Sequence, residues 1–293
     1  MPRVLGALAL AVLLITAEVA AAGPSFAAYD LRVSKLLWRQ VDLLGKSAQI
    51  LEEWSRGRLS DESATAALRR FLAAAGEVEK EVGGLRPPSG GEPLQKAAEQ
   101  AAHVRVALIR RSVEFLSAGD PRQSAIKSFL LENVASNSEA QSRWLEARLK
   151  LVPRALGQKP AAGLRHYYEW QAALLPIQLD QVRIAARLQR LLLEDGDRDT
   201  MSRSAAEATR SGIAVRQRAE AVRPSKALQE PHRRALEEQI ALARLCEAIQ
   251  LYSEDRSPES VTRIRRAVRT LSDRSREAEE GSIQSLAAAL GAK

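Results

Sequence analysis

The stretch YDLRVSKLLWRQVDLLGKSAQILEEWS, residues 29–55, shows the pattern that decides the fold of the whole chain. Its apolar residues recur at alternating steps of four and three, which places them on one face of an α-helix. That face comprises Leu37, Val41, Leu44, Ala48 and Leu51. Gly57 follows, and a glycine at this position is typical of a helix end. The stretch therefore predicts a long amphipathic helix with a broad buried side.

The same periodicity returns in seven further segments. They are separated by helix-capping residues such as Ser60 and Ser257, by prolines suited to the first helical turn, and by glycines. Pro176 is expected either to kink or to split the fifth helix. Good helix formers dominate the composition, and 45% hydrophobic with 27% charged residues is typical of a globular chain. The prediction is an all-α protein of about eight long helices, expected near residues 29–55, 61–82, 93–117, 121–152, 166–195, 199–221, 231–254 and 258–290.

Three helix-boundary signals of the first half of the chain recur in the second half at a nearly constant offset. The matching pairs are Leu85-Arg86-Pro87 with Val222-Arg223-Pro224, Glu92-Pro93 with Glu230-Pro231, and Asp120-Pro121 with Ser257-Pro258. This spacing predicts an internal duplication, with two tandem antiparallel four-helix units at residues 23–155 and 164–293 and a linker at 156–163. The alternative is coincidence, because proline starts many helices.

Residues 1–22 have the pattern of a signal peptide. Arg3 precedes an apolar run from Val4 to Ala17, and small residues at Ala20 to Ala22 suit cleavage before Gly23. This run is shorter than the about 20 residues that a membrane-spanning helix needs. We therefore expect an exported protein, periplasmic or secreted. The alternative is that the segment stays uncleaved and anchors the chain.

The single cysteine, Cys246, excludes an intramolecular disulfide. Its neighbours at helical spacing are apolar: Leu242, Leu245 and Ile249. Cys246 is therefore predicted to be a small core residue rather than a reactive thiol.

The sequence offers no recognisable metal, cofactor or catalytic motif. His103, His166 and His232 lie on distant helices, and the pairs Glu99–His103 and His166–Glu169 lack the Glu-x-x-His spacing of di-iron bundles. A haem-attachment motif, a glycine-rich phosphate loop and a G-x-S-x-G turn are all missing. We therefore expect a non-enzymatic protein without cofactor or metal, and keep a helical enzyme or cofactor carrier as an alternative.

Two stretches are candidates for binding. In the first, Val261, Ile264, Val268 and Leu271 are predicted to face inward, which places Arg263, Arg266 and Arg269 on an outer ridge. Such a ridge could hold phosphates of lipid headgroups, lipopolysaccharide or nucleic acid. The alternative is a solvated face neutralised by Asp273, Glu277 and Glu280. Nucleic acid is the least favoured partner, because no aromatic residues lie between the arginines.

The second stretch is the aromatic cluster His166, Tyr167, Tyr168 and Trp170, where the predicted second unit begins. Tyrosine and tryptophan are common at interfaces because they have one apolar and one polar end. The cluster is expected either to pack the two units together or to form a partner surface.

Together these features predict an exported binding or interaction protein of the periplasm or cell envelope. Its expected partners are other proteins, because long antiparallel helices offer extended faces. The alternative is a protein that binds a membrane surface or a polyanion, such as anionic lipid or polysaccharide, through the arginine ridge.

Overall fold

The computed structural model describes residues 25–117, 123–193 and 198–291. In these residues the chain forms eight α-helices and no strand, which confirms the all-α prediction. The helices are α2 (Phe26–Ser55), α3 (Asp61–Gly83), α4 (Glu92–Ser117), α5 (Gln123–Gly157), α6 (Ala162–Leu193), α7 (Arg198–Ala221), α8 (Gln229–Asp255) and α9 (Pro258–Ala289), with a short 3₁₀ turn η1 (Lys226–Leu228) before α8.

Serine caps explain several of the helix starts. Ser60 and Ser257 accept hydrogen bonds from the backbone N–H of Ser63 and Ser260, as the sequence predicts. Ser25 does the same for α2, which therefore begins before its predicted start at Tyr29. The predicted signal peptide and the predicted Asp120 cap lie outside the described residues.

The predicted linker at 156–163 is shorter in the structure, because helix occupies half of it. α5 continues through Pro153 to Gly157, and α6 begins at Ala162. Only residues 158–161 separate the two helices. Pro176 likewise lies inside a continuous α6. A proline inside a helix removes one backbone hydrogen bond but need not end the helix when its neighbours are packed.

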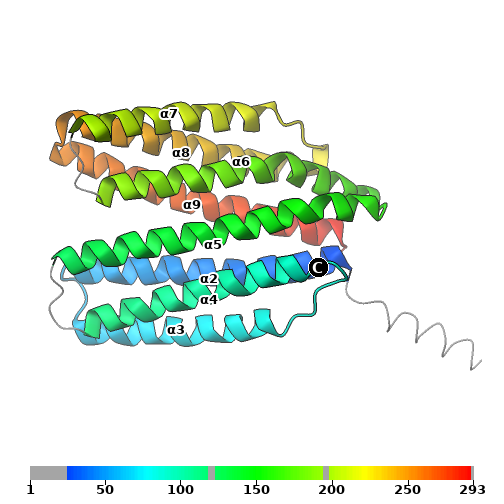
Figure 1. Cartoon of the computed structure of the whole chain (residues 1–293), viewed down its shortest axis with the longest axis horizontal. Helices are drawn as coiled ribbons and strands as arrows, with labels where there is room; N and C mark the ends of the chain where they lie inside the picture. Colours follow the sequence, from blue (N-terminus) through cyan, green and yellow to red (C-terminus); the bar gives the residue numbers. More distant parts are fainter. Residues whose placement is uncertain (1–24, 118–122, 194–197, 292–293) are drawn as a thin grey trace, which may run out of the picture.

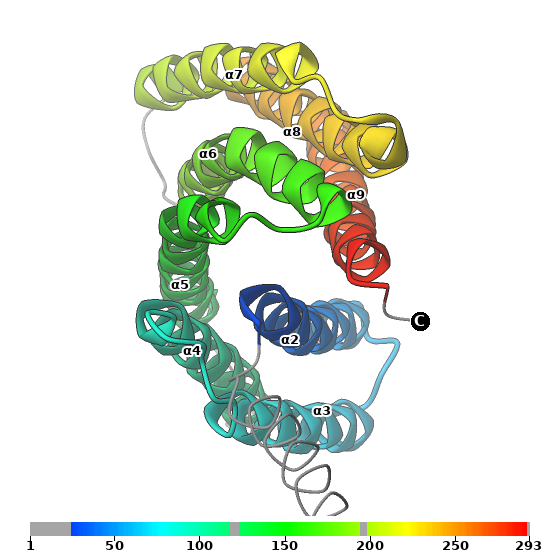
Figure 2. The same ribbon diagram turned by 90° about the vertical axis from the view of Figure 1, so that its right-hand side faces the viewer.

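The helices run antiparallel in sequence order and form two layers of four (Figures 1 and 2). α2 to α5 pack on one another, and so do α6 to α9. The two groups meet where α5 contacts α6 and where α2 contacts α9. We call this meeting zone the seam. The internal duplication, which would give the two groups of helices a common origin, stays a prediction.

One apolar core runs through both groups of helices. It includes Leu37 of α2, Trp144 of α5, Leu188 of α6 and Ile249 of α8. Cys246 is fully buried in it as a free thiol, which confirms its predicted place in the core. None of the helices described here has the length and hydropathy needed to cross a membrane.

Candidate binding groove

The aromatic cluster divides between the seam and the second group of helices. Tyr167 and Tyr168 are almost completely buried, and the Tyr168 ring lies 5.6 Å from the ring of Phe26 in α2. Trp170 points into the second group, where its indole N–H donates to Nδ1 of His232 in α8 over 3.3 Å. Only His166 is exposed. Three of the four predicted residues are therefore packed inside the folded chain, and His166 alone lies on the surface.

A buried ion pair between α2 and α5 lies at the seam. Nε and Nη2 of Arg148 donate to the two carboxylate oxygens of Asp30 over 3.1 and 3.2 Å. Arg148 also donates to the hydroxyl of Tyr167, which in turn contacts Ser282 in α9 over 3.2 Å. This network joins α2, α5, α6 and α9. Burial is the largest single effect and lowers the pKa of the Arg148 guanidinium, but Asp30, Tyr167 and Glu279 together outweigh it and raise that pKa.

Two more charges lie close to this network. Arg105 of α4 is buried and donates to the backbone oxygen of Leu37 over 3.3 Å. Burial lowers its pKa to about 10, and Glu279 partly offsets that effect. Burial also raises the pKa of Glu279 itself. The Oε1 atom of Gln171 and the Oγ atom of Ser34 have no hydrogen-bond partner among the residues described. The seam is thus polar as well as apolar.

A surface groove lies beside the start of α6, with a volume of about 380 Å³. It is built from four chain segments: the start of α6, the turn η1, the start of α8 and the end of α9. Its lining residues are Gly163, His166, Ser225, Ala227, Leu228, Glu230, Pro231, Arg234, Gly281, Gln284, Ser285, Ala288 and Ala289. Small and apolar residues thus alternate with polar ones around it. We refer to it as the α6–α9 groove.

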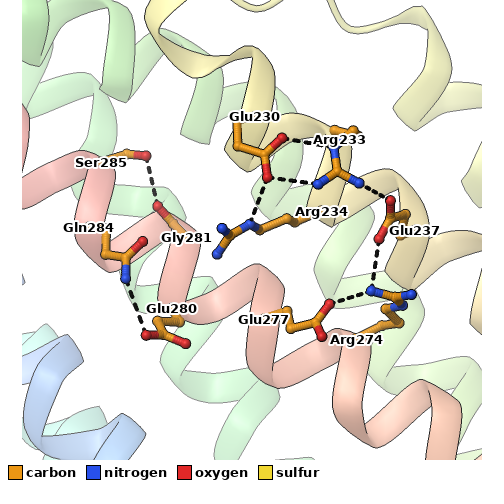
Figure 3. Close-up of polar contacts among 10 residues, drawn as sticks. All are labelled: Glu230, Arg233, Arg234, Glu237, Arg274, Glu277, Glu280, Gly281, Gln284 and Ser285. Carbon is orange, nitrogen blue, oxygen red and sulfur yellow. Dashed lines mark hydrogen bonds and ion pairs between the residues drawn. The ribbon is translucent and has the colours of Figure 1, made fainter.

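Gly281 brings α9 close to α8 along this groove. A Cβ atom at this position would lie 3.2 Å from Cδ of Arg234 and 3.6 Å from Pro231. A larger side chain would therefore push against Arg234. The hydroxyl of Ser285 donates to the Gly281 carbonyl over 2.7 Å, one turn earlier in the same helix (Figure 3).

A ladder of ion pairs forms the charged rim (Figure 3). Glu230 accepts from Arg233 over 2.7 Å and from Nε of Arg234 over 3.1 Å. Arg233 also pairs with Glu237, which contacts Arg274 of α9 over 3.0 Å. Hydrogen bonds from Arg233 and Arg234 lower the pKa of Glu230 to about 2, so this carboxylate stays ionised at neutral pH.

Some donors at the groove are not used within the described chain. The terminal nitrogens of Arg234 have no hydrogen-bond partner among the described residues, because only Nε contacts Glu230. The hydroxyl of Ser225 is also unpaired there. A second pocket shares Ser225 and His166 with the groove and continues toward Trp170 and Pro224. The groove thus combines apolar lining with free donors, which suits a ligand that carries apolar groups and an oxygen acceptor.

The sequence missed a buried polar chain in the second group. Gln239 donates to Gln181, and Gln181 donates to the carboxyl group of Glu238. All three side chains are buried. Burial raises the pKa of Glu238 to about 7, although Ser275 and Gln181 hydrogen-bond to it. The three residues lie far apart in the chain or between apolar neighbours, so no local signal identified them.

The arginine ridge is exposed, but the prediction for its other face is partly wrong. Ile264 is buried, whereas Val268 is 41% exposed. Arg263 and Arg266 form no salt bridge within the described chain, and Arg269 lies 3.7 Å from Glu52 of α2. The expected neutralisation is also wrong for two carboxylates. Asp273 pairs with Arg276 and Glu277 pairs with Arg274.

The helical His–Glu pair expected at His103 is replaced by a contact between helices. Nδ1 of His103 lies 2.9 Å from the carboxylate of Glu79 in α3, while Glu99 accepts a hydrogen bond from Gln95. Among the residues described, no group of three or more His, Cys, Asp or Glu side chains is arranged to hold a metal ion.

The chain matches no protein-family model, no curated protein and no solved structure. Function is therefore inferred from the geometry of the α6–α9 groove and of the charged surfaces.

Proposed function

We propose that this chain is an exported, non-enzymatic binding protein of the cell envelope, and that the α6–α9 groove accepts a segment of a partner protein. The observation that carries this proposal is the groove itself, in which apolar residues such as Leu228 and Pro231 lie beside the unpaired terminal nitrogens of Arg234. The signal-peptide pattern before Gly23 supports export.

The chemistry of the lining defines the segment that would fit. Leu228, Pro231 and Ala289 favour small apolar side chains, since they bury apolar surface. Arg234 and Ser225 offer donors for a carboxylate or a backbone carbonyl oxygen. The rim charges are already paired, so they contribute orientation rather than strong attraction.

The test is site-specific photo-crosslinking in the envelope of the native host. A photoreactive residue replaces Ala288 in the groove or, as the matched control, Ala74, an exposed alanine on α3. We expect a defined crosslinked partner from position 288 and none from position 74. A peptide of the crosslinked segment should bind the purified protein in calorimetry, and Ala288→Trp should weaken that binding about tenfold or more by filling the groove.

Equal crosslinking from both positions would contradict the proposal. So would a partner peptide whose affinity is unchanged by Ala288→Trp. Circular dichroism of the variant shows whether it retains the helical fold.

A further inference from the structure

At one end of the helix bundle, the connections between helices carry cations and no carboxylate. The connections after α3, α5 and α7 all lie at this end, which is on the right in Figure 1 and faces the viewer in Figure 2. They are residues 84–91, 158–161 and 222–228, and we call this surface the basic end. They contain Arg86, Lys159, Arg223 and Lys226 and no aspartate or glutamate.

These four side chains are exposed, and none forms a salt bridge within the described residues. Arg223 donates to the backbone oxygen of Glu220 over 2.7 Å, which leaves its charge uncompensated. Within four residues of these connections, the flanking helix ends add as many exposed carboxylates as cations: Lys80, Arg154, Arg165 and Arg218 with Glu81, Glu92, Glu220 and Glu230. The excess positive charge thus comes from the connections themselves.

The opposite end differs in its charge balance. Its α2–α3 connection carries Arg56 and Arg58, but these pair with Glu52 and Glu53 over 2.5 and 3.2 Å. Cations often follow helix carboxyl ends because they offset the helix dipole. That effect operates at both ends, so it does not account for the difference.

We infer that the basic end lies against an anionic lipid surface, with Arg86, Lys159, Arg223 and Lys226 contacting the headgroups. Three separate connections present these cations on one end of the bundle, as a flat charged surface requires. Each lysine or arginine next to an anionic membrane strengthens binding roughly fivefold.

The inference goes beyond the proposed groove function and does not depend on it. It also selects the basic end over the arginine ridge of α9, whose members all lie on a single helix. The ridge therefore supplies a control of equal charge.

The experiment is vesicle co-sedimentation of the chain from residue 23 onward, because the apolar run before it would itself partition into lipid. Vesicles contain phosphatidylglycerol with phosphatidylcholine, or phosphatidylcholine alone. One variant carries R86Q, K159Q, R223Q and K226Q, and the matched variant carries R263Q, R265Q, R266Q and R269Q. All eight positions are exposed, and circular dichroism verifies that both variants are folded.

We expect the unchanged protein to bind the anionic vesicles only, and high salt to abolish binding. The basic-end variant should bind about 600-fold more weakly, because it loses four cations, whereas the ridge variant should bind nearly as well as the unchanged protein. Hydrogen exchange should slow at residues 84–91, 158–161 and 222–228 in the presence of vesicles, and not at residues 56–60.

Three results would overturn the inference. The first is that the protein without substitutions does not bind anionic vesicles at low salt, whether or not it binds heparin. Another is a greater loss of binding in the ridge variant. The third is an equal loss in both variants, because binding would then follow net charge rather than position. The variant Ala288→Trp should keep vesicle binding, which separates this result from that of the groove.

Discussion

Asp30 and Arg148 form the most deeply buried ion pair among the residues described, with side chains 2% and 5% exposed. Asp30→Asn should destabilise the fold by about 3–5 kcal/mol, because it leaves the Arg148 guanidinium buried without its counter-ion. Denaturant unfolding measures this loss. Glu81→Gln, which breaks an exposed pair with Arg39, is the matched control and should cost less than about 1 kcal/mol.

The double variant with Asp30→Asn and Arg148→Met tests the cause of that loss. It should be more stable than Asp30→Asn alone, since no buried charge is left unpaired. A double variant as unstable as the single one would show that Asp30 acts through something other than the pair.

Glu238 should make stability depend on pH. Its ordinary pKa is 4.5, and burial raises it to about 7 in the folded chain. Between these values the folded chain holds a proton that the unfolded chain has released, so the free energy of unfolding falls as pH rises. The total fall should be on the order of 2–3 kcal/mol. Above pH 7 this contribution is fully lost.

The measurement is the free energy of unfolding of the original chain and of Glu238→Gln across this range. The variant should lack the fall, and the difference between the two profiles isolates Glu238. Glu279 and His232 have shifted pKa values too, but both are present in each protein. Parallel profiles would show that Glu238 is ionised in the folded state throughout.

At this scale the sequence identifies some buried apolar residues, but it also placed Val41, which is 37% exposed, on a buried face, and it did not identify the polar partners. Cys246 lies among apolar neighbours at helical spacing, so its burial follows from the local pattern. Asp30 and Arg148 are 118 residues apart, and their pairing depends on how four helices meet. The contact between Arg234 and Gly281 in the groove could not be predicted from the sequence either, because it depends on the packing of α8 on α9.

The starts of individual helices depend on single hydroxyl groups. Ser60 and Ser257 cap α3 and α9 through hydrogen bonds of 3.2 and 3.1 Å. Replacing either serine by alanine should lower the free energy of unfolding by about 1 kcal/mol, because one backbone N–H of the first turn loses its acceptor. Thermal or denaturant unfolding measures the change.

Ser89 provides the control for the caps. It is an exposed serine in the α3–α4 connection and caps no helix. Ser89→Ala should leave stability unchanged within about 0.5 kcal/mol. A loss equal to that of Ser60→Ala would mean that the caps contribute nothing specific.

Element ends are the part of the fold that the sequence predicts best. The caps of α3 and α9 and the end of α7 near Ala221 agree with the pattern of serine, proline and glycine. The predicted linker at 156–163 coincides only in part with the connection at 158–161, because α5 stays helical through Pro153 to Gly157. The predicted burial of Val268 is also wrong, since an apolar stripe is buried only where another helix covers it.

At the scale of the whole molecule, the seam should make the two groups of helices unfold together. Residues 23–157 and 158–293, produced separately, would expose the surfaces around Tyr168 and Phe26 that the intact chain buries. Each half alone should therefore be less stable than the intact chain, and the two halves should associate one to one when mixed. Sedimentation and unfolding curves measure both effects.

Asp30→Asn in the first half should weaken that association, because the ion pair with Arg148 positions the side chains that contact Tyr167. Glu81→Gln again serves as the control. If the halves fold with the stability of the intact chain and do not associate, the contacts at the seam do not stabilise the fold.

The thiol of Cys246 lies under α7, where a Cβ atom on Gly212 would be only 3.2 Å from its sulfur atom. Burial raises its pKa to about 12, so the nucleophilic thiolate is scarce in the closed protein. An alkylating reagent can then react only while α7 and α8 are separated. The labelling rate therefore reports how often this part of the molecule opens, and Gly212→Ala, which crowds the sulfur atom, should increase it.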